Sequence, residues 1–200
     1  MPQHPPNSIS PNDVSNGYDA VTGEYIKARS DIGSDIVRRW AKSLPNGGHV
    51  IDIGAGYGEP ITSVLIHAGL TVSAIDASPN MVAAFKAHFP DIEIACEAAE
   101  QSRFFGRHYD GALAIGLVFL MPPESQTILL QNIARALKPK GQFLFSAPHQ
   151  TCTWEDVLTK RQSYSLGVEG YRQILENSGL TLIGQHTDAG GNHYYDAQKG

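Results

Sequence analysis

The sequence predicts an α/β fold, a doubly wound seven-stranded sheet that is mostly parallel and carries an antiparallel hairpin at its C-terminal edge. Between His49 and Ala147, short apolar strand-like segments alternate with helical segments. This alternation is typical of a parallel sheet covered by helices. Near the C-terminus, the extended segments 180–188 and 192–198 are joined through a Gly-Gly pair, which favours a hairpin.

Each core element carries its own local signal. A proline or a capping serine marks the start of each predicted helix, near Pro60, Ser78 and Pro122. The fourth strand is apolar throughout, as expected of a central parallel strand buried on both faces. The five core strands are predicted at 49–53, 71–76, 92–96, 109–119 and 142–147.

The 200 residues suit a single domain with several functional regions. Residues 1–15 are rich in Pro, Asn and Ser and are predicted to form a disordered tail. Residues 16–200 form the domain, divided into an N-terminal helical lid (16–45), a cofactor-binding core (46–150) and a substrate-side region (151–200). Within the last region, 152–167 shows no clear periodicity.

Composition excludes several classes of partner. The net charge is −5 without a long basic run, which argues against nucleic acid held by its phosphates. Cys96 and Cys152 lack a C-x-x-C spacing, so no zinc or redox motif is present. The start resembles no secretory signal and the apolar runs are too short for a membrane span, so we expect a cytoplasmic protein without membrane contact. The oligomeric state is left open.

A glycine loop follows the first strand. After Asp52 the chain runs Gly54-Ala55-Gly56-Tyr57-Gly58 into a helix, whose free N–H groups favour a nucleotide-like ligand or mark an ordinary tight turn. Asp76 ends the second strand, where a carboxylate can accept the hydroxyls of a ribose. A structural alternative is that Asp76 caps the next helix, but Ser78 is already placed for that role.

The spacing of the glycines distinguishes two cofactor classes. The dinucleotide pattern G-x-G-x-x-G needs a glycine at position 59, where this chain has Glu59. Instead, Asp52–Gly58 resembles the first motif of class I S-adenosylmethionine-dependent methyltransferases, and Ala74–Met81 resembles their second. Segments 96–100, 109–112 and 136–142 follow in the family's order, so the resemblance extends over about residues 18–199.

The resemblance implies a Rossmann-like fold and an enzyme that converts S-adenosylmethionine to S-adenosylhomocysteine while it methylates a small molecule. It places Asp76 at the ribose and Glu97, or its acidic neighbour Glu100, at the adenine amino group. The residues that the resemblance assigns to the cofactor are Asp52, Gly54, Ala55, Gly56, Gly58, Asp76, Ala77, Met81, Glu97, Ala98, Gly116 and Leu117.

Tyr18, Tyr25 and Arg29 have helical spacing that places them on one face. One interpretation is a lid over the cofactor, with Arg29 near its carboxylate. The other is that the tyrosines pack on the domain and Arg29 is solvated. The three residues join the candidate cofactor site.

The acceptor site is expected in aromatic loops above the sheet, where an apolar pocket suits a small organic substrate. His149 is the first candidate for a catalytic base and His193 the second, because an unperturbed histidine titrates near neutral pH. The alternative for each is an ordinary surface or structural histidine. The other residues predicted there are Phe119, Leu120, Met121, Trp154, Tyr164, Tyr194 and Tyr195.

Several methyltransferase patterns are missing after the fourth strand. Residues 116–119 read Gly-Leu-Val-Phe, unlike the Asn/Asp-Pro-Pro-Tyr/Phe pattern of amino-group enzymes, and no Pro-Cys pair is present. Asp110 has no acidic partner of the catechol type, so no metal is predicted. Two alternatives stay open: a non-catalytic S-adenosylmethionine-binding protein and an NAD-type oxidoreductase.

Overall fold

The computed structural model describes residues 13–200, and positions 1–12 of the predicted tail lie outside the described residues. The main sheet contains β1 (His49–Ile53), β2 (Thr71–Asp76), β3 (Glu93–Cys96), β4 (Tyr109–Ala114), β5 (Leu137–Ser146), β8 (Leu180–Thr187) and β9 (His193–Lys199). The helices are α1 (Thr22–Ala28), α2 (Ser34–Ala41), α3 (Ile61–His67), α4 (Pro79–His88), α5 (Pro123–Ala136) and α6 (Gly167–Asn177). Short 3₁₀ turns span Ala99–Gln101, Phe104–Gly106 and Val118–Leu120.

The strand order is β3-β2-β1-β4-β5-β9-β8, which confirms the predicted fold. The first five strands of this order, from β3 through β1 to β5, pair in parallel with one another, and β9 runs antiparallel between β5 and β8. The order reverses between β1 and β4, and doubly wound sheets bind ligands outside the carboxyl ends of the strands at that point.

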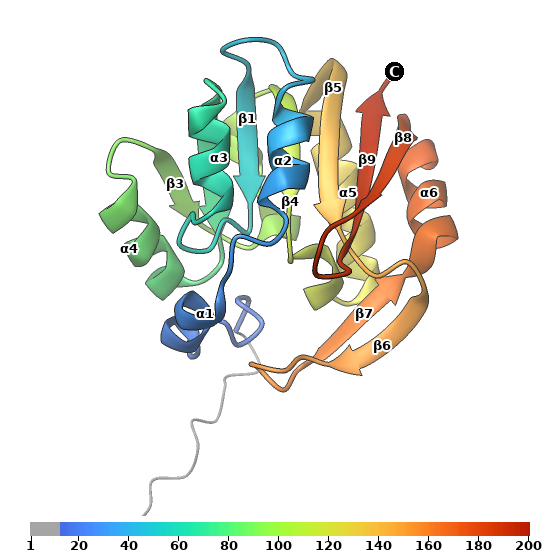
Figure 1. Cartoon of the computed structure of the whole chain (residues 1–200). Helices are drawn as coiled ribbons and strands as arrows, with labels where there is room; N and C mark the ends of the chain where they lie inside the picture. Colours follow the sequence, from blue (N-terminus) through green and yellow to red (C-terminus); the bar gives the residue numbers. More distant parts are fainter. Residues whose placement is uncertain (1–12) are drawn as a thin grey trace, which may run out of the picture.

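Alternate residues of each strand face different helical layers. Val50 packs in a cluster with Trp40 of α2 and Leu65 of α3, whereas Ile51 packs in a cluster with Leu129 of α5 on the other face. The helices thus cover both faces of the sheet (Figure 1). Burial on both faces explains why the strands are almost continuously apolar.

Three local predictions need correction. The fourth strand ends at Ala114 rather than at residue 119, because Gly116 turns with a φ of +74° and a 3₁₀ turn follows. The aperiodic stretch forms a separate antiparallel hairpin of β6 (Thr151–Glu155) and β7 (Gln162–Leu166). Asp13 and Ser15, assigned to the tail, are held by hydrogen bonds within 13–19 and to Arg161.

The helix α1 and the β6–β7 hairpin lie at the same end of the sheet, below the carboxyl ends of β1 and β5 in Figure 1. Both are therefore positioned to cover a site at the point where the strand order reverses. Over residues 13–200, no helix combines the length and apolar character required to cross a membrane.

Candidate active site

The glycine loop is held against the end of β2. The N–H groups of Gly54 and Ala55 both donate to the carbonyl of Ile75, at 2.9 and 3.0 Å. Gly54 has a φ of +71°, and a Cβ on it would lie 2.9 Å from the Leu117 side chain. Both the backbone conformation and this close approach require glycine at position 54.

The Asp76 carboxylate organises the loop. Its Oδ2 accepts from the Gly56 N–H and its Oδ1 from the Ser78 N–H, both at 2.8 Å. Ser78 caps α4 as predicted, by accepting from the Met81 N–H. Burial raises the pKa of Asp76, partly offset by these amide donors. Each carboxylate oxygen still has a lone pair for a second donor.

Asp52 is buried beneath the glycine loop and supports it. Its side chain is only 2% exposed, and Oδ2 accepts from the Thr62 hydroxyl at 2.7 Å. Burial raises its pKa to about 7. Gly58 also has a packing role, because a Cβ there would lie 2.4 Å from the Phe89 ring. The predicted loop therefore divides into residues that face a cavity and residues that support it.

A cavity of about 230 Å³, here called the glycine-loop cavity, lies beyond the ends of β1, β2 and β4. Predicted cofactor residues that line it are Tyr18, Tyr25, Gly54, Gly56, Asp76, Ala77, Met81, Glu97, Gly116 and Leu117. Predicted cofactor residues absent from its lining are Arg29, Asp52, Ala55, Gly58 and Ala98. Glu97 and Glu100 both line it, so both acidic candidates for the adenine contact stay available.

All charged residues that line the glycine-loop cavity are acidic. Its charged lining residues are Asp13, Asp76, Glu97 and Glu100, and no Lys or Arg of residues 13–200 lines it. Asp13 is paired with Arg161, whereas Asp76, Glu97 and Glu100 form no ion pair with a Lys or Arg of the described residues. Such unpaired carboxylates in a partly closed space favour a ligand that carries positive charge. A sulfonium and an ammonium group both satisfy that requirement.

The cover of the cavity comes from the N-terminal segment. Tyr18 and Tyr25 contact each other edge to face with ring centroids 5.6 Å apart, and Tyr25 also lies 3.6 Å from a Cβ built on Gly56. Arg29 donates instead to the backbone carbonyls of Ser30 and Ile32. The tyrosines thus occupy the lid position, whereas Arg29 folds back on its own loop.

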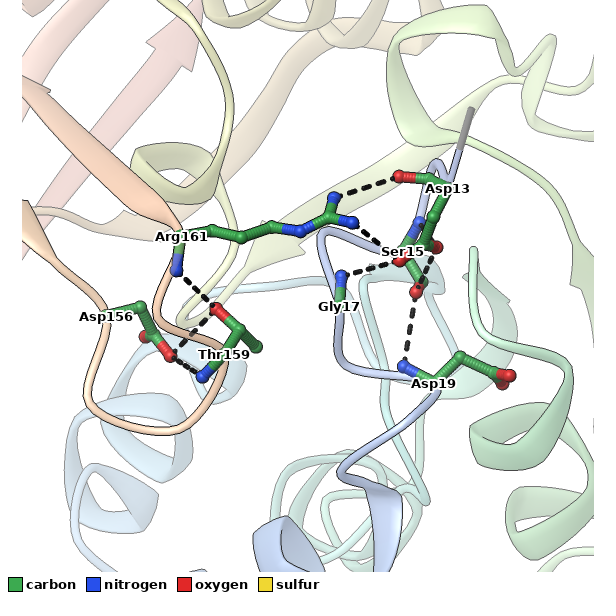
Figure 2. Close-up of polar contacts among 7 residues, drawn as sticks. All are labelled: Asp13, Ser15, Gly17, Asp19, Asp156, Thr159 and Arg161. Carbon is green, nitrogen blue, oxygen red and sulfur yellow. Dashed lines mark hydrogen bonds and ion pairs between the residues drawn. The ribbon is translucent and has the colours of Figure 1, made fainter. Parts of the chain in front are cut away.

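The N-terminal segment is fastened to the tip of the β6–β7 hairpin (Figure 2). Arg161 donates to the carbonyl and the carboxylate of Asp13, at 3.2 and 3.1 Å. The Tyr18 hydroxyl donates to Asp156 Oδ2 at 3.0 Å. Asp19 fastens the same segment to α4, where it accepts from the Ser78 hydroxyl at 2.6 Å.

A second cavity of about 610 Å³, here called the histidine pocket, lies beside the ends of β5 and β9. The rings of His149 and His193 lie 5.1 Å apart and nearly perpendicular in its wall. Burial, followed by the nearby His149 and His186, lowers the pKa of His193. The lining consists of Phe119, Ser146, Ala147, Pro148, His149, Gln150, Trp154, Asp156, Thr187, Gly191, Asn192 and His193.

The other residues predicted at the acceptor site lie elsewhere. Leu120 and Met121 line the glycine-loop cavity, and Tyr164 lines neither cavity. Tyr194 and Tyr195 are buried in the core. The two side chains lie on opposite faces of the sheet, each within a different core cluster. The Tyr194 hydroxyl donates to Asp188 and the Tyr195 hydroxyl to the Pro148 carbonyl.

The two cavities adjoin at two bridging contacts. The Gly116 N–H, from the glycine-loop cavity, donates to Ser146 Oγ of the histidine pocket at 2.7 Å. Tyr18 and Asp156 form the second bridge. The walls of the two cavities are therefore joined at these two contacts.

Several residues that line the cavities were not predicted from the sequence. Asp156 and Ser146 belong to no recognisable motif, and Asp13 falls within the predicted tail. The hairpin did carry a signal, because TCTWE and QSYSL are short runs with β-branched or aromatic residues around a turn. The D-V-S segment at 13–15 also has the Asp that favours a local turn.

Residues 50–141 match the family model described as a methyltransferase domain. This central segment is a methyltransferase domain. An uncharacterized methyltransferase from Synechocystis sp. (strain ATCC 27184 / PCC 6803 / Kazusa) is 24% identical over 159 residues, covering 75% of this chain and 74% of the relative. The sarcosine/dimethylglycine N-methyltransferase of Aphanothece halophytica is 28% identical over 167 residues, covering 76% of this chain and 60% of that relative.

Solved methyltransferases share the fold. The magnesium protoporphyrin IX methyltransferase from Synechocystis PCC 6803, crystallised with S-adenosylmethionine, superimposes with a TM-score of 0.75 at 17% identity. The match covers 98% of this methyltransferase and all of that chain (100%). The predicted family, enzyme class and cofactor are thus confirmed at the level of the family, and the predicted fold is confirmed by the strand order.

Proposed function

We propose that this methyltransferase moves the methyl group of S-adenosylmethionine to a small organic acceptor. The observation that carries the proposal is the contact between Gly116 and Ser146, which joins a cavity lined by the glycine loop to a pocket lined by histidines. A methyl donor in the first and an acceptor in the second would be neighbours, and such positioning supplies much of the rate of a displacement reaction.

The residues of the glycine-loop cavity fit the cofactor. Asp76 keeps a lone pair on each oxygen for the ribose hydroxyls, while Ala77 and Met81 offer a flat apolar surface for adenine. The acidic lining complements the positive sulfonium and ammonium groups. The cofactor supplies an activated methyl group; the surrounding carboxylates and the lid hold it away from bulk water.

The histidine pocket supplies a place for the proton. An acceptor that attacks through a lone pair forms a bond to the methyl carbon as the bond from carbon to sulfur breaks, and an N–H or O–H acceptor must also release a proton. His149 is exposed and His193 is half-buried, with a lowered pKa that keeps its imidazole neutral near pH 7. A neutral imidazole in this wall can accept the proton.

The cover must open to admit the cofactor. A volume of about 230 Å³ is small for a ligand of this size, since ligand pockets commonly measure about 300–1,000 Å³. Residues 13–18 form part of its wall and are tied to the hairpin tip by side-chain contacts. We therefore assign residues 13–28 to a lid that swings outward during cofactor exchange.

Small-molecule acceptors are consistent with the named relatives, whose acceptors are sarcosine or dimethylglycine and magnesium protoporphyrin IX. No observation favours a nucleic acid, and the net charge of −5 opposes one. The non-catalytic cofactor-binding protein would have the same glycine-loop cavity, so only the transfer reaction separates it from the enzyme.

Two measurements test the proposal. Calorimetry should detect S-adenosylhomocysteine binding, and NAD should bind much more weakly. Incubation with methyl-labelled S-adenosylmethionine and a cell extract should label the low-molecular-weight fraction, with the same yield in the presence of a chelator if transfer is metal-independent. Binding without any labelled product would favour the non-catalytic alternative, and label confined to macromolecules would contradict a small acceptor.

A further inference from the structure

The charge of the histidine pocket indicates what the acceptor carries. At neutral pH, Asp156 is the single fixed charge among its lining residues within 13–200, since the other titratable groups are the two histidines. The side chain of Asp156 comes from the hairpin tip and is turned toward the N-terminal segment in Figure 2. Asp156 as a whole is only 9% exposed to solvent.

Asp156 has neutral partners only. Its Oδ1 accepts from the Leu158 and Thr159 N–H groups, at 3.0 and 2.8 Å, and from the Thr159 hydroxyl at 3.1 Å. Its Oδ2 accepts from the Tyr18 hydroxyl, which leaves a lone pair on that oxygen. In the part of the chain that the structure describes, no Lys or Arg forms an ion pair with it, and Arg161 pairs with Asp13 instead.

The fold thus places a carboxylate in a nearly buried position without a countercharge. Such a group is costly unless hydrogen bonds or a cation compensate it, and a cationic ligand would complete the compensation. Three donors already hold Oδ1, so Oδ2 is the oxygen that a ligand would contact.

Aromatic side chains form part of the wall of the histidine pocket. The rings of Phe119 and Trp154 lie 5.4 Å apart with an interplanar angle of 44°, and the His149–His193 pair adds a second aromatic surface. Aromatic faces attract both flat ring systems and cations. An anionic acceptor group would meet the opposite situation, because the histidine pocket has no Lys or Arg in its lining among residues 13–200.

We propose that the acceptor is an arylalkyl or heteroarylalkyl amine without a carboxylate, held by Asp156 at its cationic amino group and by Trp154 and Phe119 at its ring. Where the amino nitrogen is the methylated atom, the ammonium first releases a proton, which a neutral imidazole of the same pocket can accept. The inference rests on the proposed function, since it names the substrate class of the same site. It separates this chain from enzymes whose acceptor is an amino acid, because a carboxylate would lie near Asp156 without a cationic partner.

Matched ligand pairs test the proposal on the intact protein. With the chain saturated by S-adenosylhomocysteine, calorimetry compares phenethylamine with phenylalanine and tryptamine with tryptophan, each pair differing by one carboxylate. We expect each amine to bind at least about tenfold more tightly than its amino acid, the value of one charge-assisted contact. Equal binding, tighter binding of the amino acids, or no binding of either amine would overturn the proposal.

Two variants locate the effect. Asp156→Asn keeps an oxygen for the three Oδ1 donors and removes the charge, so the tenfold preference should disappear. Glu155→Gln, on the exposed neighbour, should leave it unchanged. Binding of S-adenosylhomocysteine is measured on every variant: if the wild type fails to bind it, the proposed function itself fails, whereas normal binding without a preference for amines defeats only this inference. A preference that survives in Asp156→Asn would also defeat it.

Discussion

The Tyr18 hydroxyl donates a 3.0 Å hydrogen bond to Asp156, which joins two segments that lie 138 positions apart in the sequence. Tyr18 lines the glycine-loop cavity and Asp156 lines the histidine pocket. The contact therefore couples the cover of the proposed cofactor site to the wall of the proposed acceptor site. Arg161 and Asp13 reinforce it from the same two segments.

Removal of that hydroxyl tests the coupling. Tyr18→Phe should weaken binding of S-adenosylhomocysteine by about threefold to tenfold, because a net hydrogen bond contributes about 0.5–1.5 kcal/mol. Calorimetry gives the affinity, and hydrogen exchange over residues 13–20 should rise. Tyr164→Phe is the matched control, since Tyr164 lines neither cavity. Equal affinity and exchange in Tyr18→Phe and wild type would show that the bond does not hold the cover.

Asp76 tests the cofactor site itself. Asp76→Ala removes the acceptor of the Gly56 and Ser78 amides and the proposed ribose contact, so affinity for S-adenosylhomocysteine should fall by about 1–3 kcal/mol. Calorimetry measures the loss, and circular dichroism checks that the variant is folded. Asp91→Asn, at an exposed carboxylate before β3, should bind like wild type. An unchanged affinity in Asp76→Ala would move the ribose contact elsewhere.

Replacement of each histidine tests its role as a base. If His149 or His193 accepts the proton, its replacement by Gln should lower kcat by about 10²–10⁴-fold and abolish the acidic limb of the pH–rate profile. The lowered pKa of His193 places that limb below the usual pKa of a histidine. His108→Gln is an exposed control. A full kcat and an unaltered pH profile in both variants would remove the histidines from the chemistry.

The buried Asp52 predicts a pH dependence of stability. Its pKa is about 7 in the folded chain, against 3.8 for an ordinary Asp, so between about pH 4 and pH 7 the folded state holds a proton that the unfolded state has lost. Stability from this group is thus present at low pH and declines as pH rises through that window.

Asp52→Asn should cancel this decline while it keeps an oxygen for Thr62. Urea unfolding at pH 5 and pH 8 measures the free energy of unfolding. The variant should gain stability relative to wild type as pH increases from 5 to 8, and Asp35→Asn, at an exposed carboxylate, should show no such gain. A constant difference between Asp52→Asn and wild type at both pH values would contradict the buried titration.

Much of the site was predictable because its residues are local to a motif. Gly54, Gly56 and Asp76 follow directly from strand ends, and parallel strands bring their carboxyl ends together at one edge. Gly58 and Asp52 belong to the same motif but support the loop: Gly58 lies close to the Phe89 ring and Asp52 accepts a hydrogen bond from the Thr62 hydroxyl. A sequence motif does not distinguish contact with a ligand from support of the loop, because both need the same residue types.

The acceptor side was predictable only in part. His149 and His193 were identified as single candidates, and their approach to 5.1 Å depends on β9 pairing antiparallel beside β5. The β6–β7 hairpin was not predicted, because the buried positions of β7 are Ser163 and Ser165 rather than apolar residues, and its turn carries no Gly or Pro.

The sequence by itself determined the fold class, the position of the glycine loop and the resemblance to a methyltransferase motif. These depend on short-range patterns: the alternation of apolar segments, the spacing of the glycines and the aspartate at the end of the second strand. Only the tertiary structure decided that Asp13 and Tyr18 meet Arg161 and Asp156, and that two cavities share a wall at Gly116 and Ser146. Such contacts join distant segments, and their formation depends on the path of the chain rather than on any local preference.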